Sequence, residues 1–259
     1  MTPVMPKIYV DPGHGGKDPG AVDGISGADR LYTEEEDVNL SVALSVRAGL
    51  VRCGAQVKMS RTGDTYPTIS QRAAAANAWG ANYFYSQHFD AAGSASARGI
   101  SVLYTSAKGK MFAGNVYKFL EPLTPWGDRG IINRDNLGVL NQTRMPAIIV
   151  EGGYLTNTEE EVLINNATYR KVMAEAIVKG ICLQAGIKYI PPVPVAKPVP
   201  APTQNYVISA YHSNETEARI INQIIRDRHK AVEVRSAPKY ATPDANWNVR
   251  LARFLTTFR

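Results

Sequence analysis

Ile8-Tyr9-Val10-Asp11-Pro12-Gly13-His14-Gly15-Gly16 is the stretch of sequence that says most about the fold. Three strand-forming residues precede Asp-Pro, and Pro12 ends the strand because it has no amide hydrogen to donate to a sheet. His14 then lies just past the carboxyl end of that strand, where open α/β sheets usually bind their ligands. The flanking glycines carry no side chains, so a metal ion and a bulky substrate could both approach the ring. We therefore expect His14 to be a functional residue.

Strands and helices are predicted to alternate over residues 1–188. Ala147–Val150 is a continuous apolar run, which is typical of a strand buried on both faces of a parallel sheet. The alternation predicts an α/β fold, with a three-layer, mostly parallel sheet and helices on both faces. The expected strands are Ile8–Val10, Gln56–Ser60, Tyr83–Ser86, Ile100–Tyr104 and Ala147–Val150, and the expected helices are one from residues 33–36 to a stop at Gly54, then Ser70–Trp79, Lys108–Leu120, Glu159–Ile164 and Thr168–Ala185.

Two of these helices carry a predicted N-terminal cap. Thr33 is expected to cap the first long helix, with Glu36 as its capping-box partner three residues later. Thr158 is expected to cap the helix that starts at Glu159.

A Pro-rich segment separates two predicted domains. Prolines at the density of residues 191–202 favour an extended chain and exclude a helix or a central strand. We expect a linker at residues 189–203, between a first domain of residues 1–188 and a small α+β domain of residues 204–259; an ordered arm packed on a domain is the alternative for the linker. The small domain is predicted to contain the strands Tyr206–Ala210 and Ala231–Arg235 and the helices Thr216–Asp227 and Trp247–Phe258.

The composition, 44% hydrophobic and 20% charged among 259 residues, is that of an ordinary soluble globular protein. There is no run of about 18 apolar residues, so we expect no membrane insertion. Residues 1–7 do not form a basic-then-apolar leader, so we expect synthesis in the cytoplasm without a signal peptide. Cys53 and Cys182 are expected to be buried thiols, with a disulfide or a nucleophile as the alternatives.

The net charge of +6 is unevenly distributed. Residues 204–259 hold nine Lys or Arg against five Asp or Glu, whereas residues 1–188 are close to neutral. A basic small domain predicts an anionic partner, and the charge by itself does not choose between a wall polymer, nucleic acid and a phospholipid surface.

The candidate site consists of two histidines, one acid from the run at residues 34–36, and Glu151. His88 follows the predicted strand Tyr83–Ser86, at the same edge of the sheet as His14. Two histidines without a third suggest a metal site completed by a carboxylate, as in hydrolases that bind zinc through two His and one Glu; two unrelated loop histidines are the alternative. The carboxylate would come from residues 34–36, although three acids there could also simply favour the helix dipole, and periodicity does not choose among them.

Glu151 follows the buried strand Ala147–Val150 and precedes two glycines. Burying a carboxylate at the end of a strand costs folding free energy unless a cation neutralises it or it binds a proton. It could act as a general base with a pKa raised by burial, or it could cap the next turn.

Residues 7–186 resemble the zinc-dependent N-acetylmuramoyl-L-alanine amidases (amidase type 3) of bacterial autolysins and phage endolysins. Several weak motifs occur in the expected order, and together they make the resemblance specific. The matching segments are Asp11-Pro12-Gly13-His14-Gly15-Gly16 with Asp18-Pro19-Gly20-Ala21, Glu35-Glu36-Asp37-Val38-Asn39-Leu40, Arg61-Thr62, Arg72 with Ala76-Asn77, Ser86-Gln87-His88-Phe89-Asp90, and Met145-Pro146-Ala147 leading to Val150-Glu151-Gly152-Gly153-Tyr154-Leu155-Thr156-Asn157.

The resemblance implies that His14, Glu35 and His88 bind one zinc ion and that Glu151 is the catalytic carboxylate. It is the Glu-x-Asp-Val-Asn register of the family that selects Glu35. The implied reaction is hydrolysis of the amide between N-acetylmuramic acid and L-alanine in peptidoglycan by a zinc-activated water. Asp90, where the family commonly has Asn, and Tyr154, where it commonly has Phe, depart from the pattern.

Two other function classes stay open on the sequence: a zinc peptidase that cuts within the stem peptide, and a catalytically inactive wall-binding protein. For residues 204–259 we expect cell-wall binding, including anionic wall polymers rather than nucleic acid, with a dimerisation domain as the alternative. The missing leader favours a phage endolysin that reaches the wall after holin-type release, over a secreted autolysin. A sporulation-associated autolysin freed by lysis would have the same sequence features.

Overall fold

The computed structural model describes residues 5–23, 32–123 and 129–193. The chain divides into two units, Met1–Pro192 and Val193–Arg259, and the first contains nearly all of the described residues. The elements predicted for the small domain, and most of the predicted linker, lie outside the described residues. Among the described helices, none has both the length and the apolar character needed to cross a membrane.

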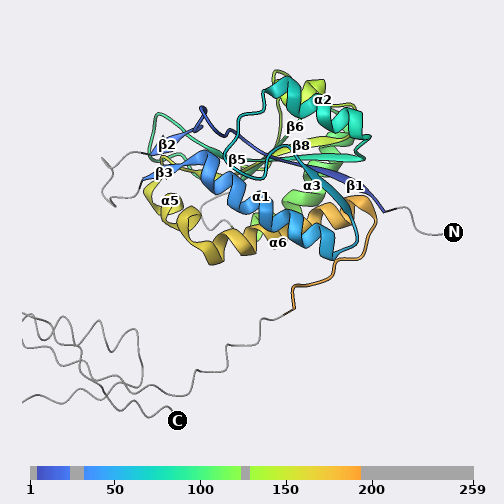
Figure 1. Ribbon diagram of the computed structural model, residues 1–259. Helices are drawn as coiled ribbons and strands as arrows, with labels where there is room; N and C mark the ends of the chain where they lie inside the picture. Colours follow the sequence, from blue (N-terminus) through green and yellow to red (C-terminus); the bar gives the residue numbers. More distant parts are fainter. Residues whose placement is uncertain (1–4, 24–31, 124–128, 194–259) are drawn as a thin grey trace, which may run out of the picture. The chain divides into compact units, whose positions relative to one another are not determined.

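A six-stranded sheet in the order β4-β1-β5-β8-β6-β7 forms the centre of this unit (Figure 1). β4, β1, β5 and β8 are mutually parallel, whereas β6 runs antiparallel to β8 and parallel to β7. The expected mostly parallel sheet is therefore confirmed. The strands are β1 (Lys7–Pro12), β4 (Gln56–Met59), β5 (Tyr83–Asp90), β6 (Ser101–Tyr104), β7 (Ile131–Asn133) and β8 (Ala147–Tyr154), and a separate small sheet pairs β2 (Val22–Asp23) with β3 (Thr33–Glu34).

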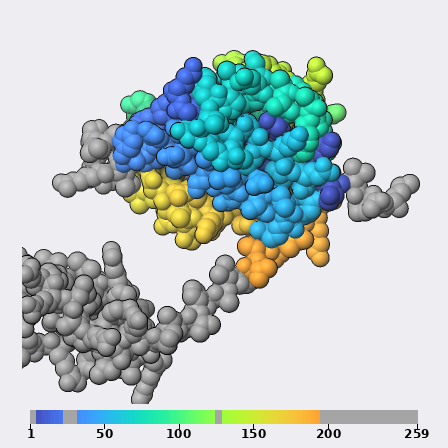
Figure 2. Space-filling model, in the orientation of Figure 1, coloured from blue at the N-terminus to red at the C-terminus, as the bar shows by residue number. Residues whose placement is uncertain are grey.

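Helices cover both faces of the sheet, as predicted. α1, α3 and α6 pack on one face, and α2 and α4 pack on the other (Figure 1). In the space-filling view, α1 forms much of the visible face, with the later helices α5 and α6 along its lower edge (Figure 2). The helices are α1 (Glu35–Arg52), α2 (Ile69–Trp79), α3 (Ala107–Leu120), α4 (Gly138–Gln142), α5 (Thr158–Asn165) and α6 (Ala167–Ala185), and a short 3-10 helix spans Glu121–Leu123.

Alternating side chains of the central strands fill the two cores. Ile8 and Val10 of β1 pack in the core under α1, α3 and α6, whereas Tyr9 between them faces the core under α2 and α4. In β8, Ile148 and Val150 belong to the first core and Ile149 to the second. Successive side chains of a strand point to opposite faces, so a continuous apolar run is what a doubly covered strand requires.

Both predicted helix caps are wrong. Thr33 pairs with Asp23 in the small sheet, and its hydroxyl donates to Glu161 at 2.5 Å, so it is not free to cap α1. The N-cap residue is Glu34, without a side-chain hydrogen bond, and the buried Glu36 carboxyl faces Asp64. α5 is capped by Asn157, one residue earlier than predicted, because its side-chain oxygen accepts the Glu160 amide.

Two strands are longer than predicted. β5 and β8 pair directly through His88 and Glu151 and continue to Asp90 and Tyr154, so these polar residues lie within strands and not beyond them. The predicted strands stop at Ser86 and Val150 because the polar residues Gln87 and Glu151 follow. Hydrogen bonds between strand backbones do not depend on side-chain polarity, so both strands continue past these residues. β7 and α4 were not predicted at all; they are short elements at one edge of the sheet and on its α2 side.

The cysteines are buried free thiols, as expected. Cys53 follows α1 and accepts the amide of Ile190 at 3.3 Å. Ile190 also accepts a hydrogen bond from Arg52 at 2.8 Å, and the Tyr189 hydroxyl donates to Glu175 at 2.7 Å. Residues 189 and 190, at the start of the predicted linker, thus pack on the first unit.

Candidate metal centre and active site

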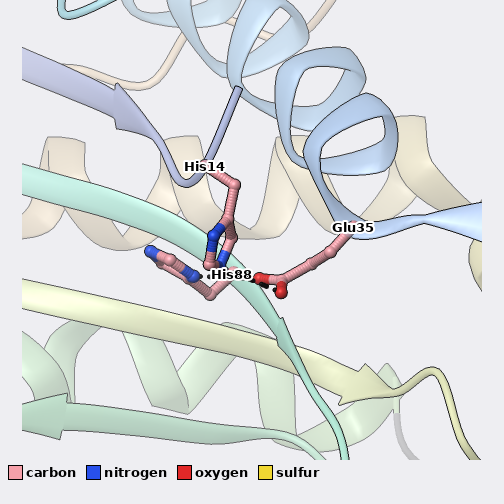
Figure 3. Close-up of side chains that lie close together, drawn as sticks. All are labelled: His14, Glu35 and His88. Carbon is pink, nitrogen blue, oxygen red and sulfur yellow. Dashed lines mark hydrogen bonds and ion pairs between the residues drawn. The ribbon is translucent and has the colours of Figure 1, made fainter. Parts of the chain in front are cut away.

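His14 lies two residues after the end of β1, at the carboxyl edge of the sheet, as the sequence indicated. Its backbone is in the left-handed region, with φ of 59°, and it is the one non-glycine residue of the described part of the chain with positive φ. A histidine in that conformation is unusual and must be held there by its surroundings. The ring points towards Glu35 and His88 (Figure 3).

Glu35, the first residue of α1, lies between the two histidines. One carboxylate oxygen is 3.0 Å from His14 Nε2 and the other is 2.9 Å from His88 Nδ1. The side chain is buried, and it also accepts the amides of Ala21 at 2.9 Å and Phe89 at 3.2 Å. Such a buried carboxylate is stable because it is surrounded by donors.

The group formed by His14, Glu35 and His88 has the composition and spacing of a metal site. One ligand atom from each residue can be chosen so that all three lie within 4.8 Å of one another. Ligands of a tetrahedral zinc ion at about 2.1 Å are about 3.4 Å apart, so only small side-chain movements separate this arrangement from a coordinated one. Two imidazoles and one carboxylate leave the fourth position of a tetrahedral site for water or substrate. The residues therefore fit a catalytic zinc ion.

The short distances between Glu35 and the two histidines also shift the pKa values of these side chains. Burial lowers the pKa of His88, but its hydrogen bond to Glu35 and the charge of that residue outweigh burial and raise the pKa to about 9. Burial raises the pKa of Glu35, but the two histidines hold it well below its usual range. The three side chains thus form two ion pairs that a metal ion would replace by displacing protons.

Glu151 lies in β8 directly opposite His88 in β5. Its Oε2 atom is buried without a hydrogen-bond partner among the described residues. Burial is the main cause that raises its pKa to about 7; the charge of His88 lowers the value, and the charges of Glu35 and Asp90 raise it. A half-buried carboxyl with one buried, unpartnered oxygen and a pKa near neutrality is suited to accepting and returning a proton.

Two polar residues hydrogen-bond the candidate ligands His14 and Glu35, and we did not predict a role for either. Asp18 Oδ2 lies 3.0 Å from His14 Nδ1, the ring nitrogen opposite the one that faces Glu35. Asn39, fully buried one turn after Glu35, donates to Oε1 of that residue at 3.1 Å. A carboxylate on the second nitrogen of a ligating histidine fixes its tautomer and orientation. Asp18 follows His14 by four residues and Asn39 follows Glu35 by four residues, and this spacing is the sequence signal from which their roles could have been predicted.

Two glycines allow His14, Glu35 and His88 to approach one another so closely. A Cβ atom on Gly13 would lie 2.2 Å from the His88 ring, and one on Gly20 would lie 2.5 Å from Glu35 Oε2 and 2.6 Å from His14 Cδ2. No side chain fits at either position unless these three residues move. The glycines of the opening motif are thus needed for the site as well as for the turn.

The structure brings His14, Glu35 and His88 into contact and places Glu151 on the neighbouring strand. Of the three acids at the start of α1, Glu34 is partly exposed and hydrogen-bonds Tyr32, and Glu36 faces Asp64. Asp90 and Tyr154, the two departures from the family pattern, are paired in register and joined by a side-chain hydrogen bond. They lie next to Glu151, whose pKa the Asp90 charge raises.

Fold and site together define an α/β protein with a His-Glu-His metal-type group and a nearby acid at the carboxyl edge of its sheet. Residues 8–182 match the family described as N-acetylmuramoyl-L-alanine amidase, type 3, and the chain belongs to that family. This confirms the resemblance found in the sequence.

Relatives and solved structures agree with the family assignment. A probable cell wall amidase of Staphylococcus aureus, LytH, is 33% identical over 174 residues, or 67% of this chain and 56% of that protein, so the match spans little more than half of the relative. The catalytic domain of CwlV, an N-acetylmuramoyl-L-alanine amidase from Bacillus (Paenibacillus) polymyxa var. colistinus, superposes with a TM-score of 0.66 at 34% identity, covering 71% of this chain and 100% of that one. The amidase AmiC2 of Nostoc punctiforme gives a TM-score of 0.64 at 31% identity, covering 70% and 97%.

Proposed function

We propose that this protein hydrolyses the amide between the lactyl group of N-acetylmuramic acid and L-alanine in peptidoglycan. The observation that carries the proposal is the convergence of His14, Glu35 and His88 beside Glu151 on the adjacent strand, whose buried Oε2 atom has no hydrogen-bond partner in the described part of the chain. The names of the matched relatives, cell wall amidase and N-acetylmuramoyl-L-alanine amidase, supply the substrate class.

His14, Glu35 and His88 would hold one zinc ion, with Asp18 and Asn39 keeping the His14 ring and the Glu35 carboxylate in place. A bound zinc ion would polarise the scissile carbonyl and make a coordinated water acidic enough to lose a proton near pH 7. Glu151 would accept that proton and deliver it to the amine of L-alanine as the C–N bond breaks. The net reaction adds one water and yields a free carboxyl on the lactyl group and a free amino terminus on the peptide.

The domain and partner assignments made from the sequence extend this proposal. Residues 1–188 form the catalytic domain, residues 189–203 the linker, and residues 204–259 a cell-wall-binding domain that also attracts anionic wall polymers through its basic charge. A tethered binding domain would raise the local concentration of the enzyme at an insoluble substrate. Lysis of a phage host, as an endolysin, stays a prediction from the sequence, and wall turnover at sporulation is its alternative.

The test is the chemistry of digested walls together with metal content. Purified walls treated with the full chain should gain free amino termini that belong to L-alanine, and the protein should hold close to one zinc ion by atomic absorption. New termini from other residues of the stem peptide would show the peptidase considered above, and intact walls would leave only a binding role. For the lytic role, co-expression with a membrane-permeabilising holin should lyse the producing cell.

A further inference from the structure

Two buried arginines contact the backbone of residues 12–14, the segment that carries His14 and is called the His14 loop below. Arg61 follows β4 and Arg72 belongs to α2, and their exposed fractions are only 4% and 5%. Together their guanidinium groups donate to the carbonyl oxygens of the three consecutive residues Pro12, Gly13 and His14. Neither side chain is part of the His-Glu-His group.

Arg61 joins the loop to the start of α1. Its Nη2 atom donates to the Gly13 carbonyl at 2.8 Å and to the Glu36 carbonyl at 2.7 Å. These two carbonyls belong to residues adjacent in sequence to the ligands His14 and Glu35. One guanidinium nitrogen thus fixes the spacing between two ligand-bearing segments.

Arg72 joins the loop to the strand that carries His88. It donates to the Pro12 carbonyl at 2.6 Å and the His14 carbonyl at 2.7 Å, and it pairs with the buried Asp11 carboxylate at 2.8 Å. The other oxygen of Asp11 accepts the hydroxyl of Ser86, two residues before His88, at 2.8 Å. The network therefore reaches all three ligand-bearing segments.

The loop needs such support because His14 has a left-handed backbone that a non-glycine residue rarely adopts. Arginine is suited to the task, since its rigid fork directs several donors at separate carbonyls at once, and a lysine cannot reproduce that geometry. We propose that Arg61 and Arg72 are positioning residues that hold His14 in its ligating conformation before any metal binds. This inference rests on the proposed zinc site.

The test compares the zinc affinities of R61K and R72K with that of the full-length wild type, by competition with a coloured chelator. R170K is the matched control, because Arg170 also donates to a backbone carbonyl, that of Ile164 at 2.7 Å, but contacts Ser41 rather than the loop. Loss of a positioning contact should weaken zinc binding by about 10- to 100-fold. The control should remain within about threefold of the wild type.

A second measurement needs no substitution and so does not depend on the variants folding. In the zinc-free wild type, the amides of Gly13 and Gly15 should exchange with solvent at least about 100-fold more slowly than in an unfolded chain, since they donate to Gln87 and Asp18. Unprotected amides, or R61K and R72K that bind zinc as tightly as the wild type, would overturn the inference. A wild type that binds no zinc would instead overturn the proposed function itself.

Discussion

His88 of β5 and Glu151 of β8 are paired residues in neighbouring parallel strands. The pairing places a candidate metal ligand and a candidate proton acceptor next to each other in the central sheet. The strands pair in regular register up to His88 and Glu151, and after a register shift they pair again at Asp90 and Tyr154. Both residues therefore belong to strands, and their relative position does not depend on a loop.

Glu151→Gln should remove the proton acceptor and keep the size of the side chain. We expect amide hydrolysis on purified walls to fall by about 10²- to 10⁴-fold, the usual contribution of a general base, while zinc content and melting temperature stay close to wild type. The measurement is the initial rate of release of L-alanine amino termini. A Gln variant that digests walls at the normal rate would refute the assignment.

Gly13→Ala should displace His88, because the added Cβ atom would lie 2.2 Å from the ring. Gly93→Ala is the control, since nothing lies within 4 Å of a Cβ atom there and neither glycine has a positive φ. We expect the first variant to lose zinc affinity by more than about tenfold and the second to bind like the wild type. Equal zinc affinities in a chelator competition would show that the His88 ring has room to move.

Asp18→Ala should free the Nδ1 atom of His14, which now lies 3.0 Å from the carboxylate. The expected result is zinc affinity weaker by about 10- to 100-fold, with much of the activity restored when zinc is added in excess. The exposed Asp135 serves as a control position of the same residue type. If saturating zinc restored nothing, Asp18 would have to act on the substrate and not on His14.

The stability of the protein should depend on pH in opposite ways with and without zinc. In the zinc-free state the folded pKa of His88, about 9, is above its unfolded value of 6.5. A raised pKa contributes stability that is complete below pH 6.5 and is lost as the pH rises through 9. With zinc in excess, fewer protons compete for the ligands as the pH rises, so zinc binds more tightly and should stabilise the folded protein more at high pH than at low pH.

Melting temperatures recorded from pH 6 to 9.5 in a chelator and in zinc would check this. A common trend in the two series would count against the three-residue metal site.

The thiols should be unreactive in the folded protein. Burial, together with the neighbouring Cys53 thiol, raises the pKa of Cys182 to about 12, so the reactive thiolate is scarce at pH 8. We expect iodoacetamide to label folded protein at least about 100-fold more slowly than protein in urea. Equal labelling rates in the two conditions would show that the thiols are accessible.

The presence and order of the central strands were predictable from the sequence because their apolar runs are buried on both faces, although β5 and β8 extend beyond their predicted ends. Ile8–Val10 and Ala147–Val150 lie within β1 and β8, and the predicted helix ends at Trp79 and Ala185 are confirmed, each followed by a left-handed glycine that caps the helix. The caps were not predictable, because a threonine at the right spacing can have another partner. Thr33 contacts Glu161, which is 128 residues away in the sequence.

The sequence by itself determined the mostly parallel sheet with helices on both faces and the approximate positions of His14, Glu35, His88 and Glu151. These features were predictable because strand periodicity and short motifs depend on residues that are close together in the sequence. Only the tertiary structure decided how these positions combine. It showed that Glu35 lies between both imidazoles while Glu36 faces away, and that Asp18 and Asn39 hydrogen-bond His14 and Glu35. It also showed that Arg61 and Arg72 contact the His14 loop from two separate segments of the chain. These relationships join segments far apart in the chain, and their geometry is set by packing and hydrogen bonding in the folded state, not by any local pattern.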